Sequence, residues 1–330
     1  MKFLIAGLGS IGRRHLRNLA SLGEKDIVLY RTHKSTMSEI DLAGYPVVTD
    51  LQQALDEKPD AMIVSNPTAL HLEVAIPAAK RGVHLLLEKP ISHNRERVTE
   101  LEQVVAKNGV KVLVGFQYRF HPTLGKLKEL LLASEIGTTV SCRVHWGDYL
   151  PDWHPWEDYR KSYAARSDLG GGVVLTLCHP FDYLRWIFGE VDSIWGITAE
   201  SEEIPIGAES VAEVGLTFAS GMTGTVHLDY IQRPGVHTLE VIGTEGTLRW
   251  DNTSGDLRMY KAGSHEWTTF YPPQGFERNS LFISEMTTFL ELLHGEIVSP
   301  CSLGDGIKAL DITLAVLDSA RENRKINLRR

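Results

Sequence analysis

The sequence predicts two domains: an α/β domain with a parallel sheet, followed by an α+β domain with a mainly antiparallel sheet. Between Met1 and about Gln117, short apolar runs alternate with helical segments, which is the rhythm of β-α-β units. After His121-Pro122, strands follow one another directly and apolar residues alternate with polar ones, as in hairpins with one buried face. We therefore expect one domain at residues 1–120 and a second at residues 121–330.

The strands of the first domain are expected at the apolar runs FLIAG, IVLY, AMIVS, VHLLLE and KVLVGF. The segments between them carry leucine and alanine stripes at helical spacing, which would cover both faces of the sheet. Right-handed crossovers bring the carboxyl ends of parallel strands to one edge. Gly7, Ser65, Glu88 and Gln117 should therefore approach a common crevice.

The second domain is expected to begin with a helix, a strand at 139–147 and an aromatic loop, followed by a helix over about 172–188. Consecutive hairpins come next, one of them closed by the turn Gly243-Thr244-Glu245-Gly246. Amphipathic helices at 280–294 and 304–320 end the chain.

Composition excludes several classes of function. The 330 residues are 43% hydrophobic and carry a formal net charge of −8, which offers no general attraction for nucleic acid or an anionic membrane. No signal peptide and no stretch of 18 uncharged apolar residues is evident, so we expect a cytoplasmic protein. Three widely separated cysteines argue against a disulfide framework or a structural zinc site, and no metal is expected.

The most informative segment reads KFLIAGLGSIGRRHL, an apolar strand, a G-x-G-x-x-G turn and the start of a helix. A pyrophosphate needs backbone N–H groups at a helix N-terminus and no side chain in its way, which spaced glycines provide. A tight strand-to-helix connection without a ligand is the alternative reading. The turn predicts a dinucleotide held by Gly7, Leu8, Gly9, Ser10, Ile11 and Gly12.

The choice between NAD and NADP rests on the end of the second strand. NAD-binding sheets carry an acidic residue there, whereas this chain has Arg31, Thr32, His33 and Lys34. Arg31 and Lys34 suit a 2′-phosphate, so the sequence leans towards NADP. A solvated basic loop would leave NAD usable.

Two segments offer groups for proton transfer. Glu88-Lys89-Pro90 ends the fifth strand, and an ammonium near an oxidised nicotinamide would have a lowered pKa. A solvated lysine paired with Glu88 is the alternative. The expected helix after Gly172 carries Thr176, His179 and Asp182 on one face, with Asp182 placed to orient the imidazole; a packing histidine is the alternative there.

These motifs together resemble the Gfo/Idh/MocA oxidoreductase family over nearly the whole chain. The likeness comprises the glycine turn, Asn66-Pro67 with His71, Glu88-Lys89-Pro90, the segment from Gly115 to Pro122, the triple-glycine helix with His179, and the 243–246 turn. The resemblance implies a Rossmann dinucleotide-binding domain joined to a domain with a large open antiparallel sheet. It also implies oxidation or reduction of a secondary alcohol on sugars or polyols.

The resemblance assigns roles to individual residues. Lys89 matches the catalytic lysine and His179 the histidine that works with it, while Thr176 stands where many members carry aspartate and cannot be a carboxylate base. Further cofactor contacts are expected from Asn66, Pro67, His71, Glu88, Lys89 and Gln117. Substrate contacts are expected from Arg119, Thr176 and His179.

The aromatic loop after residue 149 suits a sugar, because ring faces stack on C–H patches while cations hold a carboxylate or a diphosphate. A loop anchored to the sheet by its tryptophans is the alternative. The segment also resembles family loops from bacterial surface-polysaccharide pathways. The expected substrate contacts here are Trp153, Trp156, Tyr159, Arg160 and Tyr163.

The sequence thus predicts an NAD(P)-dependent dehydrogenase acting on a sugar, nucleotide sugar or polyol, in either direction. Two alternatives share the motifs: a hydrolase or epimerase that retains NAD, and a non-catalytic dinucleotide-binding regulator. A homodimer or homotetramer is expected, because an open sheet face needs a cover and family members often use a second subunit.

Overall fold

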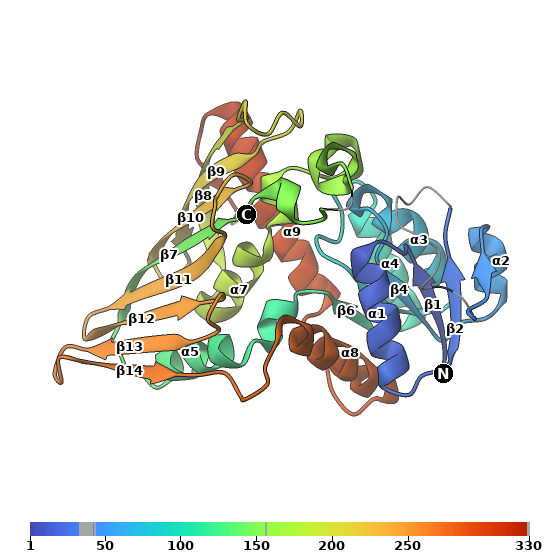
Figure 1. Ribbon diagram of the computed structural model, residues 1–330, viewed down its shortest axis with the longest axis horizontal. Coiled ribbons are helices and arrows are strands. Elements are labelled where there is room, and N and C mark those ends of the chain that lie inside the picture. Colours follow the sequence, from blue (N-terminus) through green and yellow to red (C-terminus); the bar gives the residue numbers. More distant parts are fainter. Residues whose placement is uncertain (33–41, 43, 156, 329–330) are drawn as a thin grey trace. The chain divides into compact units, whose positions relative to one another are not determined.

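A computed structural model describes residues 1–32, 42, 44–155 and 157–328 of the chain (Figure 1). The chain forms two compact units. The first unit comprises Met1–Gln117, Asp168–Gly170 and Arg278–Leu310, and the second unit comprises Tyr118–Ser167, Gly171–Glu277 and Asp311–Arg330.

The first unit is built on a six-stranded parallel sheet with the order β3-β2-β1-β4-β5-β6. The order reverses direction between β1 and β4, which places the ligand crevice of doubly wound sheets at their carboxyl ends. The strands are β1 (Lys2–Ala6), β2 (Asp26–Tyr30), β3 (Val47–Val48), β4 (Ala61–Val64), β5 (His84–Leu87) and β6 (Val112–Val114).

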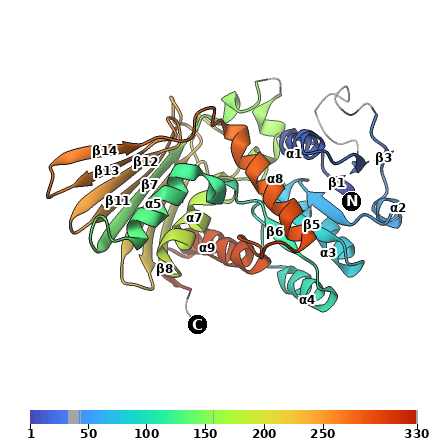
Figure 2. The ribbon, with the colours of Figure 1, turned by 90° about the horizontal axis from the view of Figure 1, so that it is seen from below.

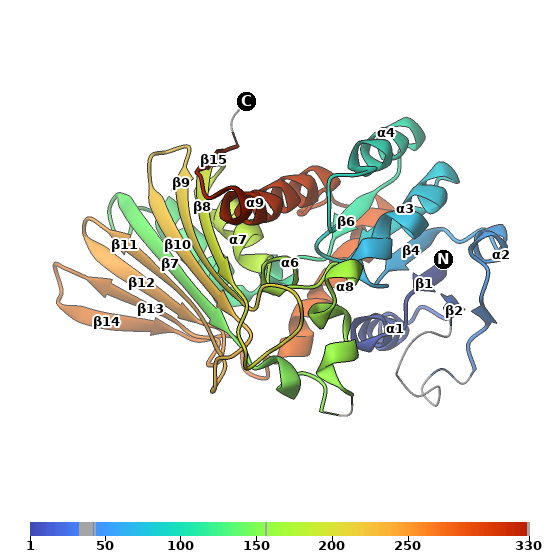
Figure 3. The same ribbon diagram turned by 90° about the horizontal axis from the view of Figure 1, so that it is seen from above.

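Helices cover both faces of this sheet, so its central strands β1 and β4 are buried except at Lys2. Helices α1 and α8 lie side by side on one face, and α3 and α4 pack together on the other (Figures 2 and 3). The helices are α1 (Ser10–Ser21), α2 (Leu51–Asp56), α3 (His71–Lys80), α4 (Val98–Asn108) and α8 (Arg278–His294).

The second unit is built on a nine-stranded sheet with the order β14-β13-β12-β11-β7-β10-β9-β8-β15. Neighbouring strands are antiparallel except for β7 and β10, which are parallel, so the sheet is mixed. The strands are β7 (Thr139–Gly147), β8 (Val191–Ala199), β9 (Val211–Phe218), β10 (Thr223–Asp229), β11 (Val236–Gly243), β12 (Gly246–Asp251), β13 (Leu257–Lys261), β14 (Glu266–Phe270) and β15 (Ile326–Asn327).

One face of this sheet packs against helices and the other is open (Figure 3). Inward residues such as Val144 and Leu239 are buried, while their neighbours Arg143 and Glu240 point to the open face. The helices of this unit are α5 (Pro122–Leu132), α6 (Val173–Thr176), α7 (His179–Phe188) and the last part of α9 (Leu303–Glu322).

The five apolar runs of the first domain are confirmed as strands, and the 243–246 turn is confirmed as a hairpin turn between β11 and β12. Other details differ from expectation. Strand β3 was missed because it has only two residues. The helix expected over 172–188 is interrupted between α6 and α7. Residues 278–310 belong to the first unit, although the sequence division assigns them to the range 121–330.

Across the described ranges, no helix combines the length and the apolarity that crossing a bilayer requires.

Candidate active site

The turn after β1 uses its three glycines differently. Gly7 has φ +94°, and a Cβ added to it would lie 2.4 Å from the backbone nitrogen of Asn66. A Cβ on Gly12 would lie 2.0 Å from the carbonyl oxygen of Gly7. A Cβ on Gly9 would meet no heavy atom within 4 Å. The fold itself requires Gly7 and Gly12, whereas Gly9 faces open space.

The first turn of α1 is suited to an anion. Gly9 is the N-cap, no side chain caps the helix, and no acidic residue lies in its first turn. Backbone N–H groups at such an end attract negative charge. With the space beside Gly9, these residues fit the pyrophosphate of a dinucleotide.

Arg13 was not expected from the sequence to matter at this turn. Its side chain is buried, and its Nε donates a hydrogen bond to the carbonyl oxygen of Leu8 at 3.1 Å. The guanidinium therefore supports the turn from within the protein. The signal in the sequence for a buried arginine was the adjacent pair Arg13-Arg14, because the helix that carries them must pack against a sheet.

His71 connects two of the loops at the carboxyl edge. Its Nδ1 lies 2.9 Å from the carbonyl oxygen of Pro90, and its Nε2 lies 2.9 Å from that of Asn66. Burial, the largest influence, lowers the pKa of His71 to about 4, so the ring is neutral at physiological pH. Both ring nitrogens of His71 thus contact the protein's own backbone. Asn66 also donates from Nδ2 to the carbonyl oxygen of Leu70.

Glu88 is buried and lies against His15 of α1, with Oε1 of the acid 2.8 Å from Nε2 of the ring. Burial raises the pKa of Glu88, but the hydrogen bond with His15 and the neighbouring positive charges outweigh it and hold the pKa below its usual range. Glu88 is therefore ionised. The backbone N–H of half-buried Lys89 also donates to its Oε2 at 3.3 Å.

A second acid lies in the same cluster. Glu285 of α8 is completely buried, and one of its carboxylate oxygens, one ring nitrogen of His15 and one carboxylate oxygen of Glu88 all lie within 4.8 Å of one another. Among the described residues, neither carboxylate oxygen of Glu285 has a hydrogen-bond partner. Burial, followed by the charge of Glu88, raises the pKa of Glu285 well above its usual range, which favours the protonated form of this acid. Sequence reasoning did not find Glu285.

The remaining cofactor candidates are placed as follows. Arg31 is buried, and its backbone N–H donates to the carbonyl oxygen of Val48 at 3.1 Å. Gln117 is buried at the end of the first unit. Lys34 lies outside the described residues.

In the second unit, His179 is the first residue of α7 and is buried against aromatic rings. Its ring centroid lies 5.8 Å from that of Trp146 in a stacked arrangement and 4.9 Å from that of Tyr118 in an edge arrangement. Thr176 ends α6, so the two residues stand on separate helices. The expected single helix face is therefore wrong, because the chain turns at Leu177-Cys178.

Asp182 has a partner that the sequence did not predict. Its two carboxylate oxygens accept hydrogen bonds from Nε and Nη2 of Arg119, at 2.9 and 2.6 Å. The side chains are 1% and 5% exposed, so this is a buried bidentate ion pair. Asp182 thus holds Arg119. The expected roles of Asp182 in orienting His179 and of Arg119 in contacting substrate stay predictions.

His237 is a further member of this aromatic cluster. It stacks on Trp146 at 4.1 Å with an interplanar angle of 6°, and its Nε2 lies 3.2 Å from the hydroxyl of Tyr183. Burial lowers the pKa of His237 well below its usual value, so the ring is neutral. His237 precedes the buried residues Leu239 and Val241 by two and four positions, so it lies on the same face of β11. This spacing was the signal in the sequence that His237 is buried.

The aromatic loop has one anchored end and one exposed end. Trp153 contacts the buried Tyr230 edge-on at 5.5 Å, as the anchoring alternative predicts. Arg160 has its guanidinium 5.0 Å from the ring centre of Tyr159, and its side chain is 61% exposed. Tyr163 is 37% exposed, and Trp156 lies outside the described residues.

A half-buried acid, Glu209, supports the glycine segment before α6. A Cβ on Gly172, which has φ +103°, would lie 2.4 Å from Oε1 of Glu209, and the same oxygen accepts a hydrogen bond from the backbone N–H of Val174. The hydroxyl of Tyr230 donates to the carbonyl oxygen of Gly172 at 3.0 Å. Glu209 was missed because only the folded chain brings it to this segment.

Comparison with known proteins agrees with this geometry. A family model described as an oxidoreductase family with an NAD-binding Rossmann fold matches residues 1–116, and the GFO/IDH/MocA C-terminal domain matches residues 124–249. Myo-inositol 2-dehydrogenase of Thermotoga maritima is 28% identical over 99% of this chain and 98% of its own length. D-xylose 1-dehydrogenase (NADP(+)) 2 of Haloferax volcanii is 28% identical over 84% of this chain and 86% of its own.

Among solved structures, levoglucosan dehydrogenase in complex with NADH and levoglucosan has the same fold. It superposes with a TM-score of 0.88 at 20% identity and covers 100% of both chains. The two family models together span most of the sequence, and the glycine turn, the strand order and the mixed sheet agree with them. The chain belongs to the Gfo/Idh/MocA family of NAD-binding oxidoreductases.

Proposed function

We propose that the protein is an NAD(P)-dependent dehydrogenase that interconverts a secondary alcohol and a ketone on a sugar or polyol. The observation that carries this proposal is the turn after β1, where only Gly9 of the three glycines faces open space beside an uncapped helix N-terminus. The named relatives act on myo-inositol and D-xylose, which are both polyhydroxylated small molecules. A polyol with adjacent hydroxyls is therefore the substrate class to test first.

Lys89 is the proposed proton-transfer residue. The nicotinamide, when bound, accepts or supplies the hydride. Lys89 directly follows Glu88 in the sequence. Glu88 is buried and ionised, and its carboxylate is held by His15. A fixed backbone at this position limits where the ammonium can reach, and positioning of a proton donor determines the efficiency of general acid–base catalysis.

His179 is the second proposed proton-transfer residue, and Thr176 is a proposed substrate contact. Packing of His179 against Trp146 and Tyr118 fixes the plane of its ring. A hydroxyl at Thr176 can donate or accept a hydrogen bond but cannot be a carboxylate base, so proton transfer rests on Lys89 and His179.

We propose NADP as the preferred dinucleotide, because Arg31 follows β2 where NAD-binding sheets place an acid. A guanidinium binds a 2′-phosphate with two hydrogen bonds. Arg31→Ala should weaken NADPH binding more than NADH binding, measured by fluorescence titration of both. Equal losses for both cofactors would show that Arg31 does not contact the 2′-phosphate.

The activity is tested with a panel of inositols, pentoses, hexoses and anhydrosugars, each with NAD and with NADP, followed by absorbance at about 340 nm. Lys89→Met should lower kcat by about 10²–10⁴-fold while leaving dinucleotide affinity unchanged. Lys25→Met, a substitution of an exposed lysine in the same unit, serves as the control and should leave kcat unchanged. Full activity of Lys89→Met, or no absorbance change with any substrate, would contradict the proposal.

A further inference from the structure

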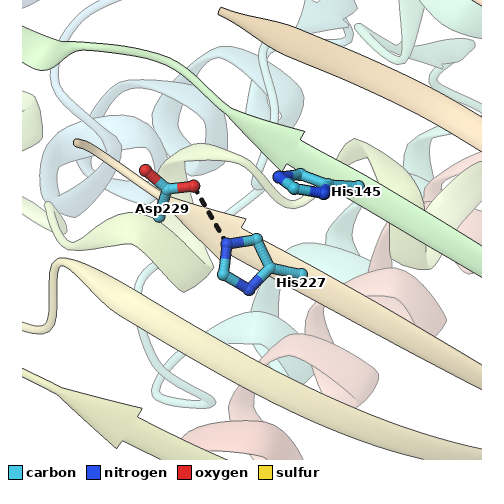
Figure 4. A group of neighbouring side chains, drawn as sticks. All are labelled: His145, His227 and Asp229. Carbon is cyan, nitrogen blue, oxygen red and sulfur yellow. Dashed lines mark hydrogen bonds and ion pairs between the residues drawn. The ribbon is translucent and has the colours of Figure 1, made fainter. Parts of the chain in front are cut away.

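The open face of the second unit carries a compact group of polar side chains from two neighbouring strands (Figure 4). His145 of β7 and His227 of β10 are direct partners in the parallel register of these strands. Asp229 follows His227 by two residues and therefore points to the same face. We call these three residues the His145 cluster.

The ligating atoms of the His145 cluster are close enough to share one ion. One nitrogen from each ring and one carboxylate oxygen all lie within 4.8 Å of one another. Nε2 of His227 is 3.0 Å from Oδ2 of Asp229, and the two imidazole centroids are 4.6 Å apart. Ligands bonded to Zn²⁺ at about 2.0–2.2 Å lie roughly 3–3.5 Å apart, so a small movement of the exposed His145 side chain completes the set.

Asp229 is held in place before any ion binds. Its Oδ1 accepts hydrogen bonds from the backbone N–H groups of Ile231 and Gln232, both at 2.6 Å, which leaves Oδ2 for the cluster. Its side chain is only 7% exposed. The neighbouring strand β7 has Gly147 beside Asp229, where a Cβ would lie 2.1 Å from Oδ2, so the absence of a side chain leaves room for this carboxylate.

Glu213 of β9 sets the orientation of His227. Its Oε1 lies 2.6 Å from Nδ1 of the imidazole. A carboxylate that accepts the Nδ1 proton directs the Nε2 lone pair outward, which is the usual support for a histidine that binds a metal. In the metal-free protein the hydrogen bonds with Asp229 and Glu213 raise the pKa of His227 to about 9, so a proton lies between Nε2 and Oδ2, and a bound metal ion displaces it.

We propose that His145, His227 and Asp229 bind a divalent transition metal ion, with Glu213 orienting His227. Two imidazole nitrogens and one carboxylate oxygen suit Zn²⁺, Co²⁺ or Ni²⁺, whereas Mg²⁺ and Ca²⁺ prefer sets of oxygen ligands. The site lies on the sheet face opposite His179, because Trp146, the residue after His145, stacks on His179 from the inner face. The metal site is therefore separate from the proposed proton-transfer residue His179.

The test uses the full-length, tag-free protein stripped of metal by a chelator and titrated with Co²⁺, followed by visible d–d absorbance. We expect a saturable band at about one Co²⁺ per chain, which Zn²⁺ abolishes by competition. His145→Ala and Asp229→Asn should each weaken Co²⁺ binding at least about 10-fold, and Glu213→Gln should weaken it about 10–100-fold. Because His145 is exposed, its substitution should leave the thermal unfolding temperature of the metal-free protein unchanged.

His294→Ala is the matched control, since this surface histidine also lies beside a carboxylate, with Nδ1 3.8 Å from Oε1 of Glu296. It should bind Co²⁺ as the wild type does. The proposal is overturned if the wild type shows no saturable band, or if His145→Ala binds Co²⁺ with unchanged affinity. A loss of the band in His294→Ala would place the ion elsewhere and would equally overturn it.

Discussion

Gly9→Ala should abolish most dinucleotide binding without unfolding the protein. Gly9 has φ −69° and ψ −168°, a conformation that alanine adopts without strain, and no heavy atom lies within 4 Å of the added methyl group. Losing glycine at an N-cap costs up to about 1 kcal/mol, and the reduced freedom of the unfolded chain offsets about 0.4–1 kcal/mol. The free energy of unfolding should therefore change by less than about 1 kcal/mol.

The methyl group would instead occupy the space that we assign to the pyrophosphate. Displacing a phosphate from backbone N–H groups at a helix N-terminus by this much should raise the Kd about 10–100-fold, or about 1.4–2.7 kcal/mol. Gly12→Ala should behave in the opposite way, because its Cβ would lie 2.0 Å from a backbone oxygen and 2.7 Å from Oγ of Ser65. That overlap should cost about 3 kcal/mol of stability or more.

The assays are urea unfolding followed by circular dichroism and fluorescence titration with NADH and NADPH. Gly125→Ala is the control, because Gly125 lies inside α5 and its added Cβ meets nothing within 4 Å. It should gain about 0.5–1 kcal/mol of stability and bind both dinucleotides normally. Wild-type affinity in Gly9→Ala, or destabilisation of Gly9→Ala as large as that of Gly12→Ala, would refute the assignment of the open space.

Three further predictions follow from buried charge and exposed apolar surface. Asp182→Asn should cost about 3–5 kcal/mol in urea unfolding, because it leaves the guanidinium of Arg119 buried without its counter-charge; a loss under about 1 kcal/mol would contradict this. Glu285→Gln should become more stabilising as the pH rises. The raised pKa of Glu285 means that the folded wild type keeps a proton that the unfolded chain releases above about pH 4.5, so the stability of the wild type relative to the variant falls as the pH rises. A constant difference between about pH 5 and about pH 8 would argue against it. Trp195 and Ile197 are exposed on β8, and we expect the double substitution Trp195→Glu, Ile197→Glu to convert a dimer or tetramer into monomers in light scattering, whereas a monomeric wild type would exclude this interface.

The positions of many strands could be predicted because their pattern is local. Parallel strands buried on both faces read as continuous apolar runs, and hairpin strands buried on one face alternate, so both sheets were visible in the sequence. The glycine turn was equally local. The two-residue strand β3 carries too few residues for any periodic pattern, and the interruption between α6 and α7 follows a run of apolar residues that continues the helical pattern.

The partners of the charged residues could not be predicted, because they are far apart in the sequence. Glu88 pairs with His15 and Arg119 pairs with Asp182, and only the packed structure shows which charges are desolvated together. Asp182 illustrates the difficulty. Its spacing of three residues from His179 suggested a local hydrogen bond, and only the folded chain brings in the guanidinium of Arg119, 63 residues away.

Each proposed proton-transfer residue is close in the sequence to one member of a buried polar pair. Lys89 directly follows Glu88, and His179 precedes Asp182 by one helical turn. Pairs of this kind add little net stability when compared with apolar residues of the same size, but they strongly disfavour any arrangement that separates the partners. They therefore fix the local backbone more than they stabilise the fold. Replacing both Arg119 and Asp182 by apolar residues of similar volume should then preserve the unfolding free energy and still lower kcat, because the position of His179 is no longer fixed.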